Sequence, residues 1–157
     1  MRKKLGWVKV LMFLSISALV SHWIHIISVW TDIPDRIAIH FTNGEPDHWG
    51  SKYVLLVMPV IALLVWWLLG KLTKHPEKFN YIHLTDKNRN KQYKMAGNMM
   101  AIIQNLALLL FIFANEAFLR SAIRTDDDIF FILSIVSLVL MLLVILYNVI
   151  WAARLKD

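Results

Sequence analysis

Four long apolar runs constrain this chain more than any other feature of its sequence. They occupy approximately residues 10–30, 53–70, 99–119 and 129–151. A helix of about 20 apolar residues spans the roughly 30 Å hydrocarbon core of a bilayer and satisfies its own backbone hydrogen bonds. The composition agrees, since 58% of the 157 residues are hydrophobic and only 18% are charged. We therefore predict an all-α fold in which residues 1–157 form a single integral membrane domain, a four-helix transmembrane bundle with a short structured extracytoplasmic loop.

The first run follows Met1-Arg2-Lys3-Lys4, a start that is also typical of a signal peptide. The run is longer than a signal-peptide core, and no small-residue cleavage site closes it before His22. We expect it to remain as the first span. The second run contains Pro59, which removes one helix hydrogen bond and predicts a kink that neighbouring helices can tolerate.

The distribution of lysine and arginine predicts the orientation, because cytoplasmic segments are enriched in both. All but four of the seventeen lie before the first span, in the basic loop 71–94 or after the last span. We therefore place both termini and the basic loop in the cytoplasm. The net charge of +6 is explained by anionic lipid headgroups, so the lipid bilayer is the expected partner and nucleic acid is not. The four basic residues on the other side are Arg36, Lys52, Arg120 and Arg124.

Enzymatic chemistry finds no support in the sequence. The chain has no cysteine, which excludes disulfides and thiolate metal sites. No serine lies in a nucleophile elbow, and the His-x-x-His of the first span lacks the glutamate of a metalloprotease helix. We therefore predict that the protein is not an enzyme and that it binds no cofactor, apart from the metal ion considered below.

The outer loop, residues 32–52, is the most informative segment. Pro34 and Pro46 restrict the residues before them, and Asn43-Gly44 is a hairpin signal that follows a short extended stretch at residues 37–41. We predict a small ordered cap over the bundle.

The outer loop and the segment after the second run contain six short motifs: Ile33-Pro34, His40-Phe41, Asn43-Gly44, Pro46-Asp47, Ser51-Lys52 and Pro76–Tyr81. These motifs resemble the DUF1648-type membrane domain, which is found in SdpI-like immunity and signal-transduction proteins of Gram-positive bacteria. The resemblance covers roughly residues 32–113, although Ile82 stands where that pattern would place a proline and the longer helix set of SdpI-like proteins is missing. It implies a bacterial cytoplasmic membrane protein that protects against a secreted toxic peptide or sequesters a repressor.

The first functional hypothesis is that a peptide or signal binds at the outer loop, in toxin immunity or signalling. Acidic residues outnumber basic ones in this loop, which favours a cationic ligand. The predicted binding residues are His40, Asn43, Gly44, Asp47, Lys52 and Glu116.

The second hypothesis is a membrane metal-binding or hydrolytic protein. His22 and His25 are three residues apart and share one helical face, and His40 and Asp47 would complete a tetrahedral set if the loop folds back. The simpler alternative is that these histidines are only interface residues. A third hypothesis is an accessory subunit of a transporter, with a repressor or another partner docking on the basic loop 71–94.

Asn98, Asn105 and Glu116 form a polar stripe along the third run, because their spacing is close to whole helical turns. Polar side chains in hydrocarbon turn inward, and an ionisable one is a functional candidate. We favour structural pairing of Glu116 with Arg120, one turn further on, over proton or ion handling. We also expect Thr85 to cap the third helix and the aspartates at 126–128 to cap the fourth.

Overall fold

The computed structural model describes residues 6–155. Each of its four long helices is long and apolar enough to cross a membrane, which confirms the predicted all-α fold. The predicted basic segment at residues 1–5 and Lys156 lie outside the described residues. In chain order the elements are α1 (Gly6–Ser28), β1 (Arg36–Thr42), β2 (Glu45–Ser51), α2 (Val54–Leu72), the short 3-10 helix η1 (Pro76–Lys78), α3 (Arg89–Ala122) and α4 (Asp128–Ala153).

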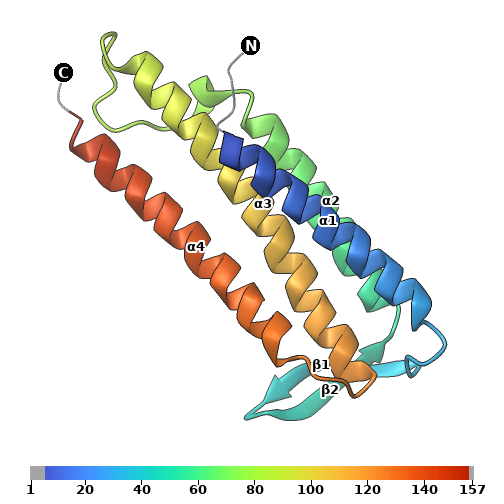
Figure 1. The fold of residues 1–157 in the computed structure, drawn as a ribbon. Coiled ribbons are helices and arrows are strands. Elements are labelled where there is room, and N and C mark those ends of the chain that lie inside the picture. The colour runs from blue at the N-terminus through green and yellow to red at the C-terminus, as the bar shows by residue number, and fades with distance from the viewer. Residues whose placement is uncertain (1–5, 156–157) are drawn as a thin grey trace.

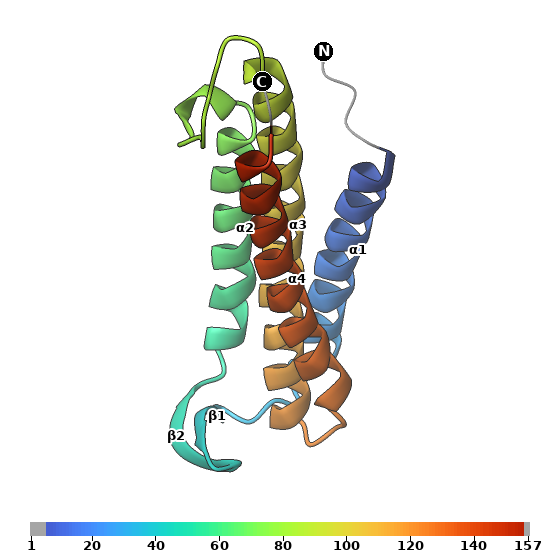
Figure 2. The same ribbon diagram turned by 90° about the vertical axis from the view of Figure 1, so that its left-hand side faces the viewer.

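Helix α3 is the axis of the molecule, because α1, α2 and α4 each pack mainly against it (Figures 1 and 2). Half of its most apolar window is buried, against 22% or less for the other three helices. The remaining faces of α1, α2 and α4 expose large apolar side chains. That arrangement suits a bilayer, where lipid tails cover apolar faces and polar groups turn toward the protein interior.

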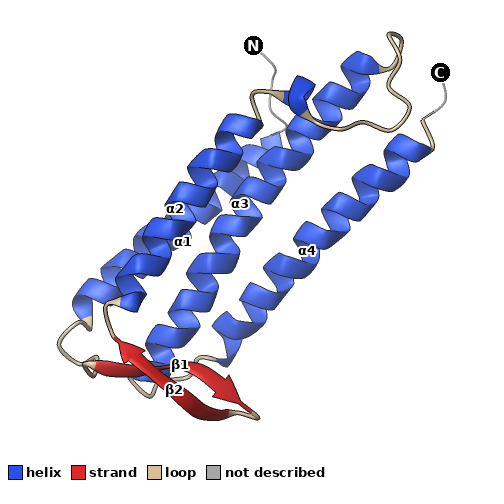
Figure 3. Ribbon diagram, turned by 180° about the vertical axis from the view of Figure 1, so that it is seen from behind, coloured by secondary structure: helices blue, strands red, loops and turns tan. Residues whose placement is uncertain are grey.

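The hairpin β1–β2 and the turn between α3 and α4 lie at one end of the bundle (Figures 1 and 3). We call it the hairpin end. Helix α1 begins and helix α4 finishes at the opposite end, together with η1. The termini of the described chain therefore share one end, as an even number of spans requires.

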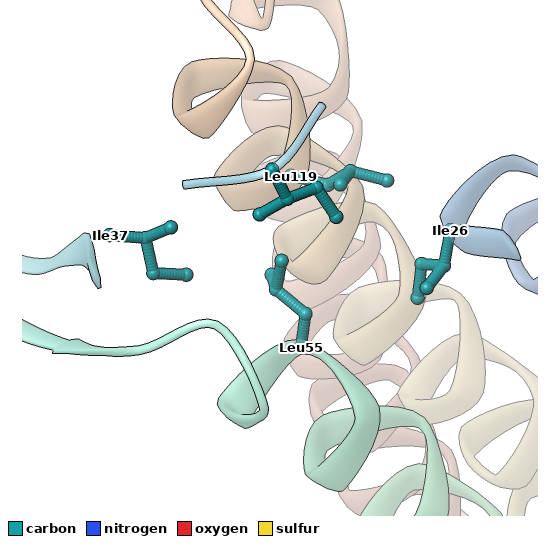
Figure 4. Close-up of a cluster of buried hydrophobic side chains, with 5 residues drawn as sticks. Ile26, Ile37, Leu55 and Leu119 are labelled. Carbon is teal, nitrogen blue, oxygen red and sulfur yellow. The ribbon is translucent and has the colours of Figure 1, made fainter. Parts of the chain in front are cut away.

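The hairpin predicted from Asn43-Gly44 is present. Strands β1 and β2 pair antiparallel, and positive φ angles of 52° at Asn43 and 83° at Gly44 are those of a two-residue type I′ turn. The base of the hairpin is fixed to the bundle through Ile37, which joins a buried cluster with residues of α1, α2 and α3 (Figure 4). That cluster comprises Ile26, Ile33, Ile37, Leu55 and Leu119.

Replacing Gly44 with valine should strain this turn, because a left-handed backbone costs a side-chain-bearing residue about 1–2 kcal/mol. We expect faster amide hydrogen exchange in residues 36–51 and unchanged exchange in α2. Asn43→Gly is the control, since glycine accepts the same φ and should leave hairpin exchange nearly as it is. Equal protection in Gly44→Val and the native chain would show that the turn geometry is not what holds the hairpin.

Of the two predicted helix caps, the one at Thr85 is present. Thr85 Oγ1 accepts a hydrogen bond from the Asn88 N–H at 3.3 Å, and Asn88 Oδ1 accepts one from the Thr85 N–H at 3.0 Å. This reciprocal pair is a capping box one turn before the regular part of α3 begins at Arg89. At α4 the cap position is Asp127, whose side chain makes no capping hydrogen bond, and Asp126 Oδ1 instead accepts from the Asp128 N–H at 3.2 Å.

Pro59 leaves the Leu55 carbonyl without its helical donor, because that carbonyl would otherwise accept from the N–H of residue 59. Asn115 of α3 supplies the missing donor, with its Nδ2 atom 2.8 Å from the Leu55 oxygen. Helix α2 accordingly continues through the proline from Val54 to Leu72. A neighbouring helix thus satisfies the freed backbone group, as a membrane span requires.

Candidate functional site

The predicted polar stripe of α3 is largely buried. Asn105 and Glu116 are buried, whereas Asn98 is only half-buried. Asn105 Oδ1 accepts hydrogen bonds from Ser15 of α1 at 2.8 Å and from the Trp66 indole of α2 at 3.3 Å. This asparagine therefore joins three helices.

Glu116 is the centre of a buried cluster between α1 and α3. The carboxylate accepts from His22 Nδ1 at 2.6 Å, from His25 Nδ1 at 2.7 Å and from Arg120 Nε at 2.7 Å. Glu116 is 5% exposed and His22 3%. The pairing with Arg120 is as predicted, and so is the shared face of the two histidines. The sequence did not reveal that this face meets Glu116.

The neighbours of His22 show which of its ring nitrogens donates a hydrogen bond and which accepts one. Asn115 Nδ2 lies 2.8 Å from both the Leu55 oxygen and His22 Nε2. A carbonyl oxygen only accepts, so Asn115 must present its NH₂ group on this side, and His22 Nε2 must be an acceptor. The His22 Nδ1 atom is therefore the one that donates to Glu116.

The cluster borders a cavity of about 170 Å³ between α1, α3 and α4. The Arg120 guanidinium lies over the Phe130 ring of α4, 4.4 Å from its centre. Within residues 6–155 every deeply buried side-chain nitrogen and oxygen has a hydrogen-bond partner. The cluster therefore joins α1 to α3 by hydrogen bonds to Glu116, and joins both to α4 through the contact of Arg120 with Phe130.

The structure does not bring the four predicted metal ligands together. His22 and His25 face Glu116, whereas His40 and Asp47 lie in the hairpin. Each pair is held by other partners, since His22 and His25 bond to Glu116 of α3 and His40 bonds to Asp47. Across the described part of the chain, two groups of three such residues have their ligating atoms close together: His40, Asp47 and His48, and Asp126, Asp127 and Asp128.

The predicted binding residues of the loop have different roles. His40 Nδ1 lies 2.6 Å from Asp47 Oδ1. Lys52 Nζ bonds to the Ile33 carbonyl and pairs with Asp35, so it fastens the base of the hairpin. Glu116 belongs to the buried cluster and not to the loop surface, which corrects the prediction that it would join the loop in one binding surface.

Asp47 is held ionised by its neighbours. The Thr42 hydroxyl donates to Asp47 Oδ2 at 2.5 Å. This hydrogen bond, followed by the one from His40, lowers the pKa of Asp47 from 3.8 to about 2.

A groove at the hairpin end joins the loop to the bundle. It has a volume of about 340 Å³, and one wall comes from the hairpin through Phe41 and Gly44. Asp127 and Asp128 supply two carboxylates to an otherwise mostly apolar surface. Apart from Gly44, none of the groove residues was predicted from the sequence as a site residue, although the run of three aspartates at 126–128 pointed to this end of the fourth helix. The other lining residues are Ala114, Ala117, Phe118, Ser121, Phe131 and Ser134.

Three apolar helices around a central helix that carries a polar stripe, with a hairpin covering one end, define a multi-span helical membrane protein. Residues 17–63 match the family model of a domain of unknown function, DUF1648. The match confirms the resemblance over residues 32–63, which include the hairpin and the first part of α2, and it also covers the second half of α1. It does not reach residues 64–113, and it carries no association with SdpI-like immunity proteins.

A curated relative from Archaeoglobus fulgidus, described as an uncharacterized protein, is 32% identical over 54 residues. The matched segment is 34% of this chain and 30% of the relative. The chain therefore matches about a third of that relative's length. No solved structure matches the chain.

Proposed function

We propose that this chain is a non-enzymatic membrane protein that binds a cationic, partly apolar peptide in the hairpin-end groove. The observation that carries the proposal is the composition of the groove, in which Phe41, Phe118 and Phe131 surround an apolar space and Asp127 and Asp128 add negative charge. Apolar walls with a few well-placed polar groups are typical of ligand sites.

The charge around the groove supports a cationic ligand. Acidic residues exceed basic ones at the hairpin end, and a surface of one sign attracts and orients ligands of the other. The acidic residues are Asp32, Asp35, Glu45, Asp47, Asp126, Asp127 and Asp128, and the basic residues outside the buried cluster are Arg36, Lys52 and Arg124.

The position of the groove also favours a ligand that arrives from water. The groove lies at the end of the bundle opposite the basic loop 71–94. We propose that the basic loop is on the cytoplasmic side. The ligand would then be extracytoplasmic, in agreement with a role in immunity to a secreted peptide or in signalling, in a bacterial cytoplasmic membrane.

Binding of a designed peptide to the protein in phosphatidylcholine nanodiscs tests the proposal. The probe is a fluorescent 12-residue peptide of leucine and lysine, and its partner carries glutamine in place of lysine. We expect the lysine peptide to bind more tightly. The double variant Asp127→Asn and Asp128→Asn should weaken binding about tenfold, since two exposed ion pairs contribute about 0.5–1 kcal/mol each.

Asp32→Asn is the control, because it removes one negative charge at the same end from a residue that does not line the groove. It should leave the affinity nearly unchanged, whereas Phe131→Ala should reduce it. The proposal fails if empty nanodiscs bind the lysine peptide equally well, if both peptides bind alike, or if Asp32→Asn matches the double variant.

A further inference from the structure

An irregularity in the hairpin brings His48 beside His40 and Asp47, which regular strands would place opposite each other on the other face. His40 pairs with His48, whereas the register of the flanking pairs would place Asp47 opposite His40, so Ile39 on β1 and Asp47 on β2 are both left without a partner in the ladder. In a regular strand Asp47 and His48 would point to opposite faces. A β-bulge redirects side chains, and here it leaves Asp47 beside both histidines.

The resulting group has the composition of a metal site. Asp47 Oδ1 lies 2.6 Å from His40 Nδ1 and 3.5 Å from His48 Nδ1. The three ligating atoms all lie within 4.8 Å of one another. Ligands held about 2.0–2.1 Å from one zinc ion in a tetrahedron are roughly 3.3 Å apart, so small side-chain rotations would suffice.

A second contact fixes the carboxylate. Thr42 donates to Asp47 Oδ2, which leaves Oδ1 directed at the histidines. Hydrogen bonds of this kind orient ligating carboxylates in metal sites. The His40 and His48 side chains are 63% and 75% exposed, so an ion can enter from water and keep a water molecule as a further ligand.

We propose that His40, Asp47 and His48 bind one divalent transition-metal ion, for which zinc is the best match to two imidazoles and a carboxylate. The ion would join β1 to β2 across the bulge. His48 replaces the pair His22 and His25 in the metal site expected from sequence. The proposal is independent of peptide binding, because none of the three residues lines the hairpin-end groove.

Zinc titration of the whole protein tests this inference. The protein is prepared without a polyhistidine tag, stripped with a chelator and titrated calorimetrically in nanodiscs at pH 7.5. We expect one ion per chain with micromolar affinity. His40→Ala, His48→Ala and Asp47→Asn should each weaken binding at least tenfold, and Thr42→Val should weaken it about tenfold through loss of the orienting contact. Cobalt should give visible absorption in the native protein but not in His48→Ala.

The controls are His75→Ala and His83→Ala, which remove histidines at the opposite end of the bundle and should change nothing. Amide spectra of the metal-free variants verify that the hairpin is still formed, which is expected for His48→Ala because its ring is exposed. Absence of stoichiometric zinc binding at millimolar concentration would overturn the inference. So would unchanged affinity in a folded His48→Ala variant, or loss of affinity in His75→Ala or His83→Ala.

Discussion

Replacing Glu116 with alanine is expected to lower the free energy of unfolding by about 3 kcal/mol, because removing one partner of a buried charged cluster leaves the others uncompensated. His22, His25 and Arg120 all donate to this carboxylate. His22 is the partner most affected, since it is buried and would keep an unpaired Nδ1 proton. The loss should appear first as separation of α1 from α3, the two helices that the carboxylate joins.

Stability is measured for this prediction by reversible denaturation in detergent micelles, with a reporter on α1 and another on α3. Glu116→Gln retains one acceptor oxygen and should cost less than Glu116→Ala. Glu77→Ala is the matched control, because it removes an exposed glutamate at the other end of the molecule and should be nearly neutral. A cost of Glu116→Ala similar to that of Glu77→Ala would mean that the cluster does not stabilise the bundle.

The sequence predicted the features that depend on local pattern. Apolar run length located the four helices, and Asn43-Gly44 located the hairpin turn because few residues accept two successive positive φ angles. The spacing of four between Glu116 and Arg120 predicted their contact. These inferences need only the helix or turn itself.

Contacts between distant segments could not be obtained in this way. Helical spacing showed that His22 and His25 share a face but not that this face meets Glu116, which lies 94 residues from His22. For the same reason, the sequence could not show that His40 and Asp47 lie in the hairpin, apart from His22 and His25. The irregular pairing at Asp47 could not be predicted from the sequence either, because the register of a hairpin depends on both strands together.

The start of α3 could not be predicted from the apolar run alone, because the first part of this helix is polar. The third run was predicted from residue 99, but α3 begins at Arg89. Its first ten residues are mostly polar, so hydropathy does not reveal them as part of a 34-residue helix. The cap at Thr85 was the better guide to the helix start, because capping depends on hydrogen bonding and not on apolarity.

The second large effect is expected at Asn115. Its side-chain amide donates both to the Leu55 carbonyl, which Pro59 leaves without a helical donor, and to His22. Asn115→Ala leaves the Leu55 carbonyl and His22 Nε2 without their donor. Because each unsatisfied buried group costs about 1–3 kcal/mol, we expect a loss of about 2–3 kcal/mol in the free energy of unfolding. Gln104→Ala is the control. It removes one hydrogen bond between α3 and α2, from the Gln104 side-chain amide to the Trp66 carbonyl, and should cost about half as much.

A double-mutant cycle with Pro59 isolates the backbone part of this loss. Alanine at position 59 restores an N–H that can reach the Leu55 carbonyl along α2, which makes the Asn115 amide redundant for that carbonyl. Pro59→Ala should therefore be more favourable by about 1 kcal/mol in the Asn115→Ala background than in the native chain. The His22 part of the loss should persist, because residue 59 offers that ring nothing. Additive effects of the two substitutions would refute the view that Asn115 replaces the hydrogen bond that Pro59 removes, and would place its contribution entirely at His22.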